Sequence, residues 1–242
     1  MTRATDPEII TTEDGLARKA LERCVGSSGV AVFPSDGLYG LACDPLDPAA
    51  VVRIHQLKGR NSGKSSAVMY FSPLAMRELV AGFGPRTAGA AGALLPGPVT
   101  LIVANRERRY PLACREDVNR LGLRLIEGPL AGAMCPVFQT SANRSGEPAP
   151  SRFEQVPEEI LAGVDLAIDG GELTGLPSTV IDIAAIDEDG SWEILRQGAF
   201  SEGDLISTDT KVASSDGDSK SSANQTGTDG YGAIRIGPIN ER

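Results

Sequence analysis

Several cations of this 242-residue chain occur at spacings that suit the binding of a phosphate. Lys58 and Arg60 stand one residue apart after an expected helix, and Lys64 follows shortly. Lysine binds phosphate as a point charge and arginine as a planar fork of donors. The dipole at a helix C-terminus favours the same cations. The run alone therefore leaves phosphate binding and helix-end solvation equally open.

Other polar groups follow expected apolar strands. Thr140-Ser141-Ala142-Asn143 offers two hydroxyls and an amide, and Arg124 and Arg196 each end an apolar run. Clusters of this kind are often capped turns, but loops that follow the strands of an α/β sheet also gather into a ligand crevice. The sequence has neither a GxxxxGK[ST] loop nor a GxGxxG motif after a strand. A standard nucleotide-binding fold is therefore not indicated.

Histidine and cysteine usage excludes several kinds of chemistry. His55 is the single histidine and lies in an expected helix, where a packed or surface role is favoured over catalysis. The four cysteines have no CxxC spacing, so we expect mostly small buried residues, no metal site and no disulfide framework. The expected chemistry therefore needs no histidine.

Composition and charge restrict the partners. A net charge of -9 opposes nonspecific binding to nucleic acid or anionic lipid, although a local basic pocket is still permitted. No apolar stretch approaches the ~20 residues that cross a bilayer, and the N-terminus lacks the apolar region of a signal peptide. We expect a cytoplasmic protein with no membrane association.

Apolar periodicity predicts interleaved helices and short strands. Residues 34–40 are expected to form a loop after the first strand. We expect an α/β fold, a single domain over residues 1–205 with one twisted mixed sheet flanked by helices around an open concave cavity. The helices are expected at 13–25, 48–57, 73–80 and 86–95, and the strands at 30–33, 67–71, 99–104, 121–125, 137–140, 165–168, 179–183 and 192–195.

The composition changes at about residue 206. Residues 206–242 form a low-complexity tail, rich in Ser, Asp, Gly, Thr and Lys, that is expected to be disordered. A short apolar island at 231–239 follows. Both a frayed end and a segment that docks back or binds a partner are consistent with this pattern.

Seven segments together resemble the YrdC/Sua5 family of threonylcarbamoyl-AMP synthases. They occur in the family's order and cover about residues 10–203. The segments are FPSDGLYGL (33–41), the LKGR run that ends at Arg60, LLPGPVTLIV (94–103), LGLRL (121–125), QTSANRSGEP (139–148), PSTVIDI (177–183) and ILRQGAF (194–200).

The resemblance implies a nucleotidyltransferase that joins L-threonine, bicarbonate or CO2, and ATP into threonylcarbamoyl-AMP and pyrophosphate. Mg2+ would arrive with ATP rather than in a protein cage. The product would feed N6-threonylcarbamoyladenosine (t6A) formation in transfer RNA by a downstream transferase complex. Such a transfer needs positioning and charge neutralisation more than a covalent nucleophile.

The resemblance also implies two groups of site residues. The first would bind ATP, with Lys58 and Arg60 as its catalytic pair, and the second would bind threonine. The ATP group is Lys58, Arg60, Lys64, Ser141, Asn143 and Arg196, and the threonine group is Ser35, Arg124 and Ser178.

The chain departs from the family's wording at several positions. The family reads PT-[DE]-T-VYGLG where this chain has Ser35 and Gly37, which predicts a looser amino-acid pocket. Asn61 and Ile126 stand where prolines are usual. A lost methyl or hydroxyl contact is worth about 1 to 3 kcal/mol of discrimination, enough to blur threonine against serine.

Two other functions are consistent with the residues. One is a carbamoyl-adenylate enzyme that uses carbamoyl phosphate, although such modules belong to larger chains. The other is a noncatalytic module that contacts double-stranded RNA or transfer RNA, against which the net charge argues.

Overall fold

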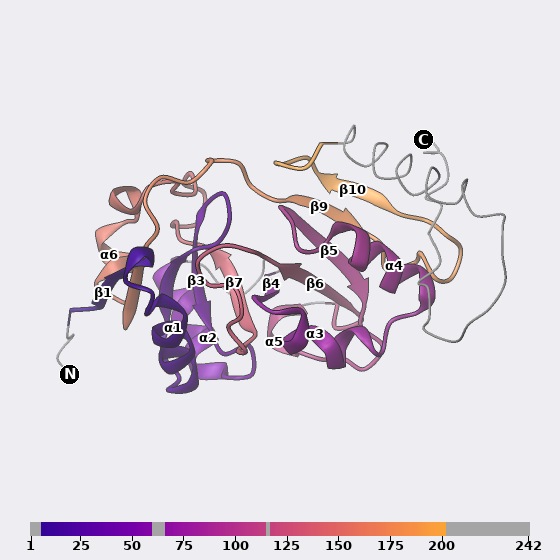
Figure 1. Cartoon of the computed structure of the whole chain (residues 1–242), viewed down its shortest axis with the longest axis horizontal. Helices are drawn as coiled ribbons and strands as arrows, with labels where there is room; N and C mark the ends of the chain where they lie inside the picture. Colours follow the sequence, from indigo (N-terminus) through magenta and orange to yellow (C-terminus); the bar gives the residue numbers. More distant parts are fainter. Residues whose placement is uncertain (1–5, 60–65, 115–116, 202–242) are drawn as a thin grey trace, which may run out of the picture.

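Ten strands form one mixed sheet in our computed structural model, which describes residues 6–59, 66–114 and 117–201 (Figure 1). The expected mixed α/β fold is confirmed. The strand order is β1-β8-β2-β3-β7-β4-β6-β5-β9-β10. The strands are β1 (Glu8–Thr11), β2 (Ala31–Pro34), β3 (Tyr39–Cys43), β4 (Ala67–Tyr70), β5 (Val99–Ala104), β6 (Arg120–Leu125), β7 (Val137–Ser141), β8 (Leu166–Asp169), β9 (Thr179–Asp182) and β10 (Glu193–Arg196).

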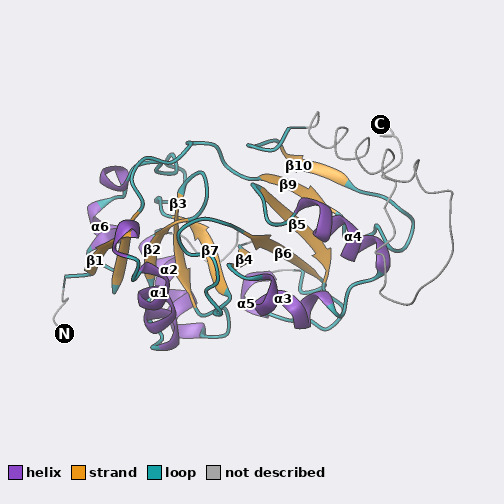
Figure 2. Cartoon of the chain, viewed as in Figure 1, coloured by secondary structure: helices purple, strands orange, loops and turns teal. Residues whose placement is uncertain are grey.

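Short helices connect the strands (Figure 2). Asp47 caps α2 by accepting hydrogen bonds from Ala49 N and Ala50 N, and Pro48 occupies the first helical position, where its missing N–H costs nothing. The helices are α1 (Ala17–Gly26), α2 (Pro48–Leu57), α3 (Pro73–Val80), α4 (Pro85–Leu94), α5 (Pro111–Cys114) and α6 (Glu158–Leu161), with 3-10 turns η1 (Thr12–Asp14) and η2 (Phe153–Gln155).

The core lies on both faces of the sheet because the strands are apolar on both sides. Along β2, Val32 belongs to one buried cluster, whereas Ala31 and Phe33 belong to the other. Helix α1 packs in the second cluster, and buried residues of α2 to α6 belong to the first. Among the described helices, α1 is thus the only one with buried residues in the second cluster.

The predicted loop at 34–40 is too long. Tyr39 and Gly40 already belong to β3, which pairs antiparallel with β2 and leaves a tight turn at 35–38. Strand β3 was not predicted because Gly40 and the turn residues before it obscure its apolar pattern. β1 and the one-turn helices α5 and α6 were also not predicted.

Several expectations fall outside the described residues. They include the expected tail at 206–242 with its island at 231–239. Within the described ranges, no helix has the length and apolar character that a membrane crossing requires.

Candidate functional site

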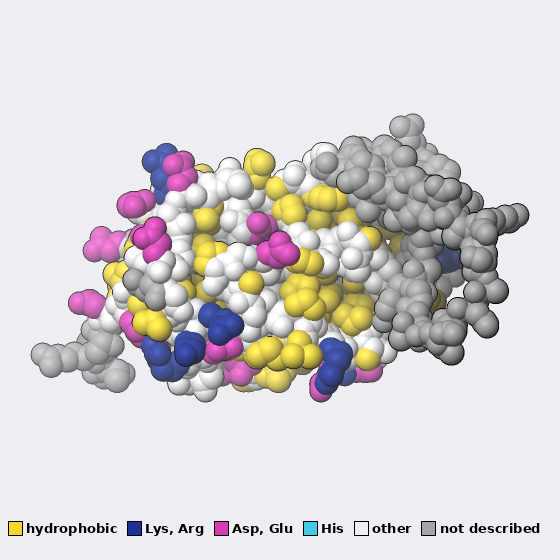
Figure 3. Space-filling model, viewed as in Figure 1, with side chains coloured by type: hydrophobic (Ala, Val, Ile, Leu, Met, Phe, Trp, Pro, Cys, Tyr) yellow, Lys and Arg dark blue, Asp and Glu magenta, His cyan; other side chains and the backbone are white. Residues whose placement is uncertain are grey.

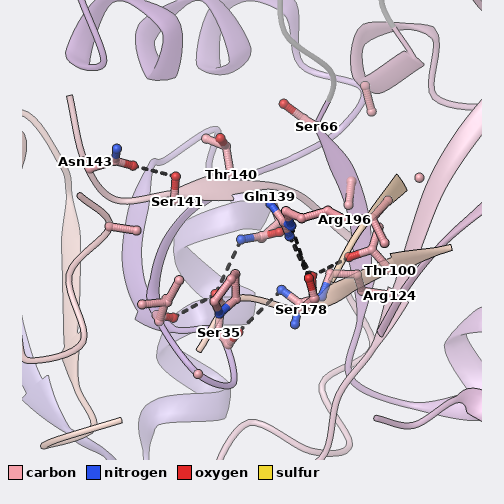
Figure 4. Close-up of a pocket in the computed structure, with 18 of the residues that line it drawn as sticks. Ser35, Ser66, Thr100, Arg124, Gln139, Thr140, Ser141, Asn143, Ser178 and Arg196 are labelled. Carbon is pink, nitrogen blue, oxygen red and sulfur yellow. Dashed lines mark hydrogen bonds between the residues drawn. The ribbon is translucent and has the colours of Figure 1, made fainter. Parts of the chain in front are cut away.

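A cavity of about 690 Å3 lies beside the middle of the sheet (Figure 4). Its lining comes from β3 to β7, β9 and β10, from α5 and from the loops beside them. All seven described residues of the two expected binding groups line it. They are Ser35, Lys58, Arg124, Ser141, Asn143, Ser178 and Arg196. Arg60 and Lys64 lie outside the described residues.

Strand alternation brings these side chains to one wall. On β5, Val99, Leu101 and Val103 are buried in the core, while Thr100 and Ile102 line the cavity. On β6, positions 121, 123 and 125 likewise face the core, while 120, 122 and 124 line the cavity. Because side chains alternate along a strand, the apolar pattern of the core determines which polar groups reach the cavity.

Lys58 is buried rather than exposed at a helix end. Its exposed fraction is 2%, and it follows directly after α2. Its Nζ donates to Asn143 O at 2.7 Å, to Asn143 Oδ1 at 3.1 Å and to Ser141 O. Solvation at a helix end, one of the two roles that the sequence left open for this cation, is therefore wrong. Lys58 thus holds the 141–143 segment in place through these hydrogen bonds.

The 141–143 segment carries more structure than a capped turn. Ser141 Oγ donates to Asn143 Oδ1 at 2.5 Å, and Asn143 Nδ2 donates to Glu147 O at 2.6 Å. Every polar atom of the Asn143 side chain thus has a protein partner. These bonds hold the hydroxyl and amide groups at the cavity rim beside Lys58.

Arg124 is almost fully buried at the base of the cavity. Its Nη2 contacts Asp36 Oδ2 at 3.3 Å and its Nη1 donates to Ser35 O at 3.4 Å. Burial lowers the pKa of Arg124 to about 10, although Asp36 acts in the opposite direction. Within the described residues, Nε is buried without a hydrogen-bond partner. A guanidinium held by two long contacts and with a free N–H is suited to receive an anion.

Asp36 was not predicted as part of the site. Burial raises the pKa of its carboxyl group, and Arg124 lowers it by a smaller amount. Its backbone has φ of +81°, the left-handed region that Asp tolerates better than most residues. The tight turn therefore places this carboxylate against Arg124.

A second arginine lies at the other end of the wall. Arg196 on β10 donates from Nε and Nη2 to Ser178 O at 3.3 and 2.8 Å, and from Nη2 to Ser178 Oγ at 3.2 Å. Ser178 Oγ lies 2.8 Å from Thr100 Oγ1. Burial lowers the pKa of Arg196. Thr100 thus belongs to the site, although only its motif was noted in the sequence.

The space at Gly37 is filled by the neighbouring loop. A Cβ atom there would lie 2.1 Å from Leu176 O and 2.7 Å from Thr174 Oγ1. Gly175 N also donates to Gly37 O at 2.9 Å. The expectation that Gly37 loosens the pocket is therefore wrong, because the 174–176 segment occupies the place of the missing side chain.

The histidine and the cysteines that the sequence singled out are mostly packed within the protein. His55 is 8% exposed, and its ring meets Phe138 edge to face at a centroid distance of 5.8 Å, which confirms a packed helical histidine. Of the cysteines, Cys43 and Cys114 are buried and Cys24 and Cys135 are partly exposed. Among the described residues, no three His, Cys, Asp or Glu side chains are grouped to hold a metal ion.

Sequence comparison finds one matching family model and a group of relatives that share one name. A family model described as Sua5/YciO/YrdC, telomere recombination, matches residues 24–198. A threonylcarbamoyl-AMP synthase of Nitrosococcus oceani is 30% identical over 167 residues, which is 66% of this chain and 89% of that protein. One from Pyrococcus abyssi is 32% identical over 164 residues, or 64% of this chain and 47% of that protein.

Structural comparison finds the same fold. E. coli YciO superposes with a TM-score of 0.64 at 25% identity, covering 81% of this chain and 96% of YciO. P. abyssi Sua5 in complex with L-threonine gives a TM-score of 0.71 at 23% identity, covering 84% of this chain. The match covers 61% of that longer protein.

Proposed function

Because the chain belongs to the Sua5/YciO/YrdC family, we propose that it is a threonylcarbamoyl-AMP synthase. Its substrates would be L-threonine, CO2 or bicarbonate, and ATP, and its second product pyrophosphate. The adenylate would then serve t6A formation in transfer RNA. Support comes from the names of the relatives and from the threonine that P. abyssi Sua5 holds in its crystal structure.

The observation that carries the proposal is the buried Arg124 with its unpartnered Nε at the cavity base. Arg124 binds the carboxylate of threonine in this proposal, and the hydroxyls of Ser35 and Ser178 lie on the same wall. A carboxylate in the cavity can pair with the guanidinium by displacing the long contact between Nη2 and Asp36. The cost of desolvating the guanidinium has already been met during folding.

ATP would occupy the part of the cavity between Lys58 and Arg196. Ser141 and Asn143 present their groups there, and Arg60 and Lys64 complete the phosphate-binding set in this proposal. The described lining has a single carboxylate, Asp117, so Mg2+ would arrive as part of the substrate MgATP. The cations would neutralise phosphate charge, which is the main requirement of this transfer.

The reaction then needs no protein nucleophile. The threonine amine adds to CO2, a C–N bond forms and a proton leaves to solvent. A carbamate oxygen attacks the α-phosphorus of ATP while the bond to the β-phosphate oxygen breaks, which releases pyrophosphate. The protein holds the reactants in line and excludes competing water.

Pyrophosphate release tests the proposal. We expect release that requires ATP, L-threonine and bicarbonate together, and threonylcarbamoyl-AMP as the product by mass spectrometry. Release with carbamoyl phosphate in place of threonine and bicarbonate would instead show a carbamoyl-adenylate enzyme. Arg124→Ala should raise the KM for threonine by at least about tenfold and change that for ATP much less, since a charged hydrogen bond is worth about 1.5 to 3 kcal/mol.

A further inference from the structure

Gln139 presents an amide to the cavity and has no assigned role. It lies on β7, its side chain is 9% exposed, and it lines the cavity two residues before Ser141. Gly40 on the neighbouring β3 makes room for this side chain. A Cβ atom at Gly40 would lie 3.1 Å from Gln139 Nε2 and 3.0 Å from Ser35 Oγ.

The orientation of this amide follows from its neighbour Ser35. Ser35 Oγ donates its one hydrogen to Leu38 O at 2.9 Å. Toward Gln139 it can therefore act only as an acceptor, so the atom that faces it at 3.4 Å is the amide nitrogen. Oε1 is then directed away from Ser35. Within the described part of the chain, no hydrogen bond to this oxygen is found.

The carbonyl oxygen of the Gln139 amide is an acceptor on a wall where most of the charged groups are donors. Arg124, Arg196 and Lys58 line the same cavity, and Figure 4 draws the Gln139 amide between Ser35 and Arg196. Arginine and lysine offer hydrogen atoms only. A ligand that binds both kinds of group therefore presents an acceptor to the arginines and a donor to the Gln139 carbonyl oxygen.

Arg124 and Gln139 contact the same residue from two sides. Arg124 Nη1 donates to the carbonyl oxygen of Ser35, and Gln139 Nε2 donates to its hydroxyl. Both side chains thus contact Ser35 and line the same cavity. A small molecule with a carboxylate and a hydroxyl on adjacent carbons can contact the two together.

We propose that Gln139 determines amino-acid specificity, its side-chain carbonyl accepting a hydrogen bond from the β-hydroxyl of the amino acid whose carboxylate Arg124 holds. This rests on the proposed function. A neutral amide suits a neutral hydroxyl, whereas an ammonium group is better matched by a carboxylate. The amine must also stay free to react with CO2. Amino acids without the hydroxyl would leave the buried amide unpaired, which is how a polar site rejects an apolar isostere.

The test compares threonine with valine, which has nearly the same shape and lacks the hydroxyl. The variant is Gln139→Met, which preserves length and removes both polar atoms. The matched control is Gln56→Met, on the exposed side of α2. The quantity measured is the ratio of kcat/KM for threonine to that for valine, in which any loss of folded protein cancels.

We expect Gln139→Met to lower this ratio at least about tenfold and Gln56→Met to leave it unchanged. An unchanged ratio in Gln139→Met, or an equal loss for both amino acids, overturns the assignment. Titration calorimetry with L-threonine and L-valine gives the corresponding ratio of dissociation constants, which depends on binding alone. It therefore tests Gln139 even if no adenylate forms, the outcome that would refute the proposed function.

Discussion

Lys58 is a cation whose surroundings define its role. The ammonium group is enclosed by oxygens of the 141–143 segment. Its charge offsets the partial negative charge of these oxygens and orders a segment that lies 83 residues away in sequence. A cation bound in this way can turn one N–H toward a phosphate only if the segment moves with it. We therefore expect Lys58 to couple the shape of the rim to nucleotide binding.

Lys58→Ala should destabilise the protein as well as inactivate it. Two carbonyl oxygens and one amide oxygen would lose a charged donor in a buried position, which costs at least about 2 kcal/mol. Urea unfolding measures this change. Lys19→Ala, on the exposed side of α1, is the matched control and should change stability by less than about 0.5 kcal/mol. Equal stability in the two variants would contradict the buried role.

Asp36→Asn should change the pH dependence of stability. The raised pKa means that the folded state binds this proton more tightly than the unfolded state does. Stability from this group is therefore lost as pH rises from the ordinary Asp value through the folded pKa. The variant lacks this loss, so it should gain stability relative to wild type as the pH rises above about 4, the ordinary Asp value.

Urea unfolding of both proteins at several pH values measures that difference. A difference that stays constant or shrinks with rising pH would show that Arg124 compensates the buried carboxylate fully.

At the scale of elements, strands β5 and β9 determine the shape of one wall. They pair in parallel, with Thr100 opposite Val180. This pairing brings the Thr100 hydroxyl to 2.8 Å from that of Ser178, just before β9. Arg196 reaches the same serine from β10. One hydroxyl thus links three neighbouring strands.

Thr100→Val keeps the branched shape of the side chain and removes its hydroxyl. Ser178 would then be oriented by Arg196 alone. We expect the KM for threonine to rise about two- to tenfold with little change in kcat, the size of one lost neutral hydrogen bond. Thr100→Ser, which keeps the hydroxyl, should restore the KM. Steady-state kinetics gives these KM values. An equal KM for threonine in the two variants would contradict the role of the Thr100 hydroxyl in orienting Ser178.

The sequence predicted the elements whose pattern is local. The strands predicted at 99–104 and 137–140 are apolar or β-branched runs with clear ends, and Asp47-Pro48 marks the start of α2. β3 was hidden by Gly40, whose small size serves a contact with Ser35 and Gln139 rather than the strand. The glycine is required by a tertiary contact, and such a contact leaves no pattern in the local sequence.

The resemblance supplied positions that the structure brings to one cavity, whereas the burial and packing of the side chains could not be predicted. Ser35, Arg124 and Ser178 line one cavity as expected. The burial of Lys58 and the place of Gln139 depend on partners about 80 to 100 residues distant. No periodicity or spacing could indicate them. The closed space at Gly37 likewise depends on a loop from another part of the chain.

The net charge of the chain and the described residues on the face in Figure 3 do not favour the binding of nucleic acid. The net charge is -9, and on the face shown in Figure 3 basic side chains lie in small groups beside acidic ones. Neutralising many phosphates needs a continuous basic surface. The cations described in the cavity are grouped for a small anion instead.

Duplex RNA should therefore bind weakly. By fluorescence anisotropy at physiological salt we expect a Kd no tighter than about 10^-6 M, the nonspecific range. A tighter Kd with a steep dependence on salt, in a protein that releases no pyrophosphate, would favour the RNA-binding alternative.

The order of strands also has a consequence for synthesis on the ribosome. β1 and β2 both pair with β8, more than 130 residues further along the chain, and β5 pairs with β9. Pairings between distant segments are slow to form because a long loop must close first. Arg196, in the last strand, emerges after every other part of the cavity wall. A nascent chain thus has no complete binding site until that strand has left the exit tunnel, and β1 lacks its partner strand until β8 has emerged, a state that is prone to aggregation.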